Sequence, residues 1–211
     1  QNINTPKQTI RAGEQCLSPG DTLLVRGGTY KIPPGTPTQD YCFICILPSG
    51  TSWENATTVK GYPGERPIIS GPNTQPHTPG HAYGITFYSN GYKSYVIVEN
   101  FIVEWVGVGI DTQEGHHIRV KDIEVRNIQA GGVMGHANYA EYINLDVHDW
   151  GLQKDFSCGT CDHGYYYGGD NTLIEGGQQH DGYGYGIQLR APGASSNNAV
   201  IRSTRTYNNT L

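Results

Sequence analysis

Apolar and polar residues alternate in short runs that recur along the second half of the chain. Each run is often β-branched, and a period of two is typical of a strand with one buried face. Equivalent positions recur after 22, 22, 32 and 27 residues. The aligned runs, each predicted as a strand, are 99–104, 121–126, 143–148, 175–180 and 202–207.

A second short strand that opens on glycine is predicted after each of the first four runs. These strands begin at Gly109, Gly132, Gly164 and Gly186. Every repeat therefore holds at least two strands and two or more corners, and one repeat cannot bury its own apolar face. Stacking the repeats about 4.8 Å apart creates a continuous core. The sequence thus predicts an all-β protein, a parallel β-helix.

The N-terminal part differs from these regular coils. Residues 9–16 are predicted to form a short amphipathic helix or turn, and 1–26 to cap the solenoid and supply its first strand, because an open end would expose core and strand edges. The regular coils cover 95–208, and we interpret 1–211 as a single domain. The last coil ends without a capping element, which suggests a longer parent protein, a covering partner or end-to-end self-association. Further strands are expected at 22–25, 42–47, 57–60, 67–70 and 85–88.

Composition narrows the possible partners and compartment. The chain has 211 residues, of which 29 are glycine and only 16% are charged, which suits a solenoid with many tight corners. A net charge of −5 gives no reason to expect nucleic acid or an anionic membrane as partner. No apolar run approaches the roughly 18 residues of a membrane span. The start at Gln1 fits a processed secreted protein, and sequons at Asn55 and Asn208 fit a glycoprotein.

The cysteines point to an oxidising compartment. Two C-x-x-C pairs are present, and disulfides are the favoured interpretation; free thiols and a metal site are the alternatives. A Cys158–Cys161 bridge would pin the longest corner insertion. The odd count leaves one thiol over. The five residues are Cys16, Cys42, Cys45, Cys158 and Cys161.

Several motifs carry a family resemblance. They are PGDTLLV at 19–25 with GTY at 28–30, LPSGT at 47–51 and TVKGYPGERPIISG at 58–71, followed by HGYYY at 163–167 and GIQL at 186–189. Together these resemble right-handed parallel β-helix proteins of the pectate-lyase-like group. The resemblance implies a secreted protein that acts on polysaccharide, with calcium as a candidate cofactor. The group also includes glycoside hydrolases, epimerases and non-catalytic proteins, so it implies the fold more specifically than the activity.

Stacked coils place equivalent residues in columns about 5 Å apart. With Val103, Val125 and Val147 pointing inward, the flanking columns point outward. One outward column reads Glu104, Arg126, His148, His180, Tyr207; a parallel one reads Ile102, Glu124, Asp146, Gln178, Arg205; the next position reads Trp105, Asn127, Asp149, Asp181, Asn208.

These columns supply candidate catalytic residues. Arg126 could hold a uronate carboxylate and stabilise the charge that develops as the neighbouring carbon loses its proton. His148 or His180 could take that proton, with Asp149 assisting. Asp146 and Asp181 could orient the histidines or bind calcium. The alternatives are an exposed Glu104–Arg126 ion pair, stacked histidines, and a ladder of amide and carboxyl side chains that bond the backbone at coil corners.

Aromatic residues near the longest insertion are candidates for sugar binding. Trp150, Tyr166 and Tyr185, with Arg190, are the predicted substrate contacts, provided that the rings are exposed. His163 lies beside Tyr185 in the predicted register and is expected to pack among the tyrosines rather than to catalyse.

The leading functional prediction is a polysaccharide lyase that cleaves a uronate-containing glycan by β-elimination. A glycoside hydrolase using Asp149 and Asp181 is one alternative. A non-catalytic glycan-binding or structural β-helix is the other.

Overall fold

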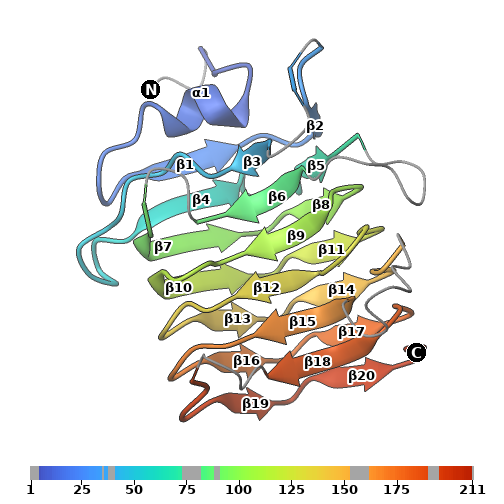
Figure 1. Cartoon of the computed structure of the whole chain (residues 1–211). Helices are drawn as coiled ribbons and strands as arrows, with labels where there is room; N and C mark the ends of the chain where they lie inside the picture. The colour runs from blue at the N-terminus through green and yellow to red at the C-terminus, as the bar shows by residue number, and fades with distance from the viewer. Residues whose placement is uncertain are drawn as a thin grey trace.

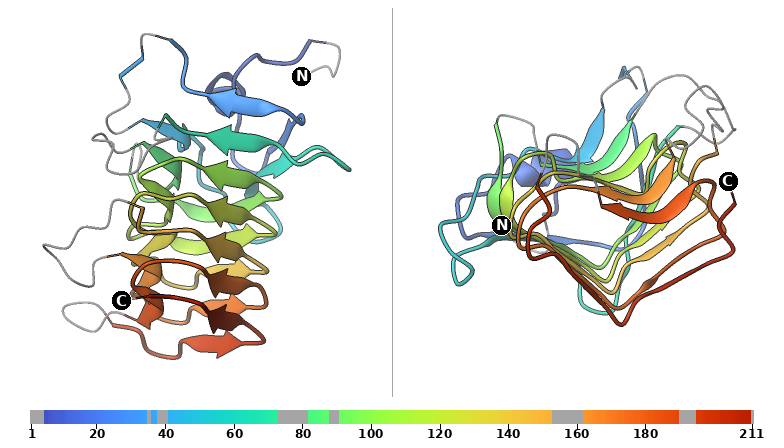
Figure 2. Two further views of the ribbon diagram at one scale, coloured as in Figure 1. Left: turned by 90° about the vertical axis from the view of Figure 1, so that its right-hand side faces the viewer. Right: turned by 60° about the horizontal axis from the view of Figure 1, so that its bottom comes forward.

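The chain folds into a right-handed parallel β-helix with three strands in each complete coil (Figure 1). The computed structural model describes residues 5–34, 36–37, 41–72, 82–87, 91–152, 162–189 and 195–210. All strand pairing between named strands is parallel, and along each sheet successive strands are three apart in the chain. The prediction of an all-β parallel solenoid is confirmed. Figure 2 shows the coils stacked on one another.

Each sheet runs the length of the stack. Sheet A contains β1 (Thr22–Val25), β4 (Thr57–Gly61), β7 (Ser94–Glu99), β10 (His116–Lys121), β13 (Glu141–Ile143), β16 (Leu173–Glu175) and β19 (Val200–Arg202). Sheet B contains β2 (Thr29–Lys31), β5 (Ile68–Ser70), β8 (Ile102–Glu104), β11 (Glu124–Arg126), β14 (Asp146–His148), β17 (Gln178–His180) and β20 (Arg205–Tyr207). Sheet C contains β3 (Cys42–Ile44), β6 (Tyr83–Thr86), β9 (Val108–Asp111), β12 (Val133–Gly135), β15 (His163–Tyr167) and β18 (Tyr185–Leu189).

The predicted N-terminal helix is present and lies at the first coil (Figure 1). It is α1 (Ile10–Glu14), which contacts β1 and β3. Thr9 caps it by accepting a 3.1 Å hydrogen bond from the Ala12 N–H, the usual role of a threonine before a helix. Ile10 and Glu14 are buried against the coil beneath. No helix of the described residues is long and apolar enough to cross a membrane.

The strands predicted at 99–104 and its equivalents contain a corner, which corrects their assignment as single strands. In the first of them Glu99 ends β7, Asn100 has φ 65°, and β8 begins at Ile102. Asp122, Asn144, Gly176 and Ser203 adopt the same left-handed conformation on later coils. Asparagine, aspartate and glycine adopt the left-handed conformation most readily. Their recurrence at this position therefore marks the turn between sheets A and B.

The core is a set of inward columns, as the sequence predicted. Val103, Val125 and Val147 are fully buried in register on sheet B. Sheet C approaches them closely at its glycines: a methyl group on Gly132 would lie 2.3 Å from a Val147 methyl and 2.7 Å from the Gly164 carbonyl oxygen. Glycine recurs in this column because no side chain fits between the two sheets.

One disulfide joins Cys42 and Cys45, the first C-x-x-C pair. Cys16 is a free, exposed thiol. The predicted Cys158–Cys161 bridge lies outside the described residues.

Candidate functional site

The outer face of sheet B gathers most of the predicted site residues. β11, β14, β17 and β20 pair in the predicted register: Arg126 lies beside His148, His148 beside His180, and His180 beside Tyr207. The parallel column is also confirmed, with Glu124 beside Asp146 and Gln178 beside Arg205. The residue types of this face are therefore brought together by strand pairing alone.

The aspartates that follow the histidines are held at a left-handed corner. Asp149 has φ 53° and Asp181 has φ 55°, matching Asn127 and Asn208 in the same column. This backbone turns each carboxylate back toward the preceding ring. Asp149 Oδ2 lies 2.7 Å from His148 Nδ1, and Asp181 Oδ2 lies 2.6 Å from His180 Nδ1. The His180 contact lowers the pKa of Asp181, and a bond to Asn208 adds to it. Asp181 and Asn208 are thus joined side chain to side chain, whereas the predicted ladder bonds the backbone of the next coil. The two aspartates orient the histidine rings.

The second nitrogen of each ring faces a carboxylate of the preceding coil. His180 Nε2 lies 3.1 Å from Asp146 Oδ1, and His148 Nε2 lies 3.5 Å from Glu124 Oε1. A carboxylate only accepts hydrogen bonds, so it pairs with whichever ring nitrogen carries a proton. Both imidazoles are thereby fixed in orientation along the column.

The rings form a continuous stack. His148 and His180 have centroids 4.9 Å apart and planes within 5°, and His180 and Tyr207 follow at 4.8 Å and 4°. This spacing matches the separation of adjacent strands. The predicted stacking of the histidines is confirmed, and their edges rather than their faces are what a ligand would meet.

Arg126 is occupied by its neighbours. Its Nε and Nη2 donate to Glu104 Oε2 at 2.9 and 2.8 Å, and its Nη1 donates to Glu124 Oε1 at 2.7 Å. Two carboxylates thus compensate one guanidinium. This matches the ion-pair alternative, and it argues against Arg126 as the group that holds a substrate carboxylate.

A cleft of about 340 Å³ lies on this face, lined in part by residues of β14, β17 and β20. Arg205 lines it, is exposed, and has no ion-pair partner among the described residues. Asp146, the carboxylate on His180 Nε2, is another wall of the same cleft. The repeat predicted the column of Arg205 but no role for it. The available signal was Gln178, an uncharged residue, beside it on the coil before. The remaining lining residues are Asn144, Gly177, Gln178 and Ser203.

The proposed calcium ligands do not converge. Asp146 and Asp181 contact opposite nitrogens of the His180 ring, so the imidazole stands between their carboxylates. Within the described ranges, no group of three histidine, cysteine, aspartate or glutamate side chains could hold a metal ion. The described geometry therefore does not bring Asp146 and Asp181 together around one ion, and a calcium site at these residues stays a prediction.

The predicted aromatic contacts do not reach this face. Trp150 is only 1% exposed and packs in the core against Gly182, so it offers no surface to a sugar. Tyr166 and Tyr185 belong to sheet C, where both pack beside His163 with centroids 4.7 and 5.8 Å from its ring. The prediction that His163 packs among tyrosines is confirmed. Arg190 lies outside the described residues.

Comparison with solved structures finds the same β-helix fold in two proteins that are named as lyases. The crystal structure of pectate lyase Pel9A superposes with a TM-score of 0.76 over 100% of this chain, at 18% identity. An alginate lyase from Paenibacillus sp. str. FPU-7 gives 0.63 over 94% of this chain, at 16% identity. The chain spans 50% of the length of the first and 73% of the second. No protein-family profile matches the chain. No curated protein sequence matches it either.

Proposed function

We propose that the protein is a secreted polysaccharide lyase that binds a uronate-containing glycan on the outer face of sheet B and cleaves it by β-elimination. The observation that carries the proposal is the cleft lined by Arg205, which has no ion-pair partner among the described residues, and by Asp146, whose carboxylate holds the imidazole of His180. The two structural neighbours, a pectate lyase and an alginate lyase by title, support the same class of substrate. The Cys42–Cys45 disulfide supports an oxidising compartment.

β-Elimination requires two chemical tasks. The carboxylate of the uronate must be held and its developing negative charge stabilised, which suits Arg205. The proton on the adjacent carbon must be removed by a base, which suits His180. The 2.6 Å contact from Asp181 to Nδ1 holds the ring so that Nε2 is directed to the cleft wall. The substrate would replace Asp146, whose side chain is 40% exposed, as the partner of Nε2.

The remaining lining groups suit sugar hydroxyls. Asn144, Gln178 and Ser203 offer amide and hydroxyl groups that both donate and accept hydrogen bonds. Since these groups lie on three successive coils, a chain running across the coils would meet them in order.

The test is absorbance at the unsaturated-uronate band with pectate, alginate, glucuronan and glycosaminoglycans, each with calcium and with chelator. We expect a rise on one substrate. Arg205→Gln should raise KM and lower kcat/KM by about 100-fold. Arg202→Gln is the matched control, because Arg202 lies in the same coil but on sheet A, paired with Glu175 at 2.9 Å. A wild-type protein inactive on the whole panel, or an Arg205→Gln variant equal to Arg202→Gln, contradicts the proposal.

One observation favours a second candidate, non-catalytic glycan binding. Both nitrogens of His148 and His180 already face carboxylates, and Arg126 is doubly paired. A purely binding face would use Arg205 and the cleft amides in the same way. Saturable binding of a uronate oligosaccharide that depends on Arg205, without any absorbance change, would identify this function.

A further inference from the structure

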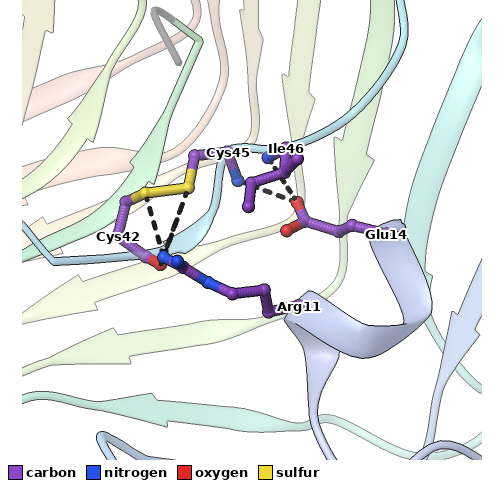
Figure 3. Close-up of a disulfide and its surroundings, with 5 residues drawn as sticks. All are labelled: Arg11, Glu14, Cys42, Cys45 and Ile46. Atoms are coloured by element: carbon purple, nitrogen blue, oxygen red, sulfur yellow. Dashed lines mark hydrogen bonds between the residues drawn. A yellow bond between two sulfur atoms is a disulfide. The ribbon is translucent and has the colours of Figure 1, made fainter. Parts of the chain in front are cut away.

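The disulfide between Cys42 and Cys45 lies at the N-terminal end of the stack, next to α1 (Figure 3). The proposed glycan site does not use it. Cys45 is fully buried, whereas Cys42 retains 8% exposure. Cys42 is therefore the residue of the pair that lies nearer the surface.

Arg11 of α1 is directed at both sulfur atoms. Its Nη2 donates a 2.9 Å hydrogen bond to the Cys42 carbonyl oxygen and lies 3.6 Å from Cys42 Sγ and 4.0 Å from Cys45 Sγ (Figure 3). A guanidinium keeps its charge at every accessible pH. A fixed cation stabilises a thiolate, which is the form that leaves when a disulfide opens. Arg11 thus favours cleavage of the bond between the two sulfurs.

A cavity of about 190 Å³ is lined by residues of α1, β2 and β3. Tyr41 and Phe43, the chain neighbours of Cys42, line it together with Arg11. Arg11 is the link between cavity and disulfide, because it lines the cavity and its Nη2 lies 3.6 Å from Cys42 Sγ.

Glu14, the last residue of α1, also binds the segment that carries the disulfide. Its Oε1 accepts hydrogen bonds from the Cys45 N–H at 2.8 Å and the Ile46 N–H at 3.3 Å (Figure 3). Arg11 and Glu14 thus both hold α1 against the segment 42–46. A change in the conformation of this segment would therefore alter the hydrogen bonds that hold α1 in place.

We propose that Cys42–Cys45 is a thiol–disulfide exchange site for low-molecular-weight thiols, and that its reduction releases α1 from the first coil. A thiolate attacks Cys42 Sγ to form a mixed disulfide, and Cys45 leaves as a thiolate beside Arg11. A second external thiolate then attacks the external sulfur atom of this mixed disulfide. The two external thiols leave as a disulfide, and Cys42 is released as a thiolate. The two protons of the external thiols end on the two cysteines, and two electrons are transferred.

The reduced protein is expected to stay folded. The two cysteines are separated by three positions, and a loop this short restricts the unfolded chain far less than a long one. The coils below α1 retain their sheet hydrogen bonds and their buried columns.

The experiment treats the folded chain with millimolar glutathione, alkylates the thiols formed and quantifies them by peptide mass spectrometry. The exposed Cys16 thiol reports labelling efficiency. We expect labelling of Cys42 and Cys45 while the circular dichroism spectrum is unchanged. Arg11→Gln should slow the reaction about tenfold and Arg11→Lys less than about threefold. Arg26→Gln, which removes an exposed arginine paired with Glu65, should react as the wild type does.

Two results would overturn the exchange site: no labelling of Cys42 and Cys45 until denaturant is added, or equal rates for Arg11→Gln and Arg26→Gln. Hydrogen exchange tests the release of α1, since the Gly13 and Gln15 amides donate to Thr9 and Arg11 within the helix. Both should exchange faster after reduction. A Cys42→Ser/Cys45→Ser variant gives the same comparison without reductant, and unchanged exchange in it would rule out the release.

Discussion

His148 and His180 lie on neighbouring coils with their rings parallel and 4.9 Å apart, yet they meet different surroundings. Each Nδ1 is bonded to the aspartate that follows it. The carboxylate at His180 Nε2 belongs to Asp146, which lines the cleft, whereas the one at His148 Nε2 belongs to Glu124, which does not. The two rings are therefore a matched pair for locating the base.

The first prediction concerns this pair. His180→Gln should lower kcat on the best substrate by about 100-fold or more, because it removes the group that takes the proton. His148→Gln should lower it by less than about tenfold. The absorbance assay measures both. Equal losses in the two variants would place the base elsewhere, and unchanged unfolding midpoints would exclude a folding defect as the cause.

The second prediction separates Arg126 from Arg205. Arg126→Gln removes the only cation of Glu104 among the described residues and one of the two cations of Glu124, which keeps Arg66 at 3.3 Å. It should lower the free energy of unfolding by about 1 kcal/mol, discounted because the Arg126 side chain is 31% exposed. Its KM should stay within about twofold of the wild type. Arg205→Gln should show the reverse, with stability unchanged and KM raised. Urea unfolding and steady-state kinetics supply the two readouts; a KM defect in Arg126→Gln as large as that of Arg205→Gln would refute the assignment.

The third prediction concerns the contact between sheets B and C. Gly132→Ala places a methyl group 2.3 Å from a Val147 methyl and against the Gly164 carbonyl, so the strands must separate. We expect a loss of about 1–3 kcal/mol in the free energy of unfolding, measured with urea. Gly27→Ala is the control, since the three atoms nearest its new methyl all belong to the side chain of Glu65 and none to the backbone. If Gly132→Ala lowers the free energy of unfolding no more than Gly27→Ala does, sheets B and C can move apart here without loss of stability.

The fourth prediction concerns Glu14 under α1. Burial raises the pKa of this carboxyl from 4.5 to about 7, against the opposing effect of the Cys45 and Ile46 N–H groups. The folded state therefore holds a proton that the unfolded state loses between pH 4.5 and 7, and stability falls as pH rises through that window. The stability lost across this window is on the order of 3 kcal/mol.

Glu14→Gln should abolish that part of the pH dependence, as shown by urea unfolding at pH 4.5 and pH 8. Glu54→Gln is the control: this exposed carboxylate has its pKa lowered by a hydrogen bond from its own backbone, so its contribution is lost only at more acid pH. If Glu14→Gln keeps the wild-type slope, the carboxyl is ionised in the folded state near neutrality.

The columns of sheet B were predictable because repeat length fixes register. Once Val103, Val125 and Val147 are aligned, the placement of Arg126 beside His148 follows from strand geometry. The corner at Asn100 was not recognised, because apolar and polar residues continue to alternate through it. Recurrence of asparagine, aspartate or glycine at this position was the available signal.

The interactions among site residues were harder to predict than their columns. A column does not say whether Arg126 meets substrate or Glu104, since that depends on side-chain rotamers. It also does not say which aromatic residues are buried: Trp150 looked available next to Asp149 but turns into the core. The His-Asp dipeptide at the end of both β14 and β17 was an unused signal for paired rings and carboxylates.

The left-handed corner that follows every sheet B strand from β8 to β20 is kept where the chain changes loop length. The step from residue 143 to 175 is 32 residues, against 22 for the step before it, yet β14 and β17 stay in register and Asp149 and Asp181 keep the same backbone conformation. The paired strands of sheet B therefore keep their positions when a coil is lengthened by an insertion. Evolution or design can remodel one corner to select a different ligand while the face of sheet B remains in place.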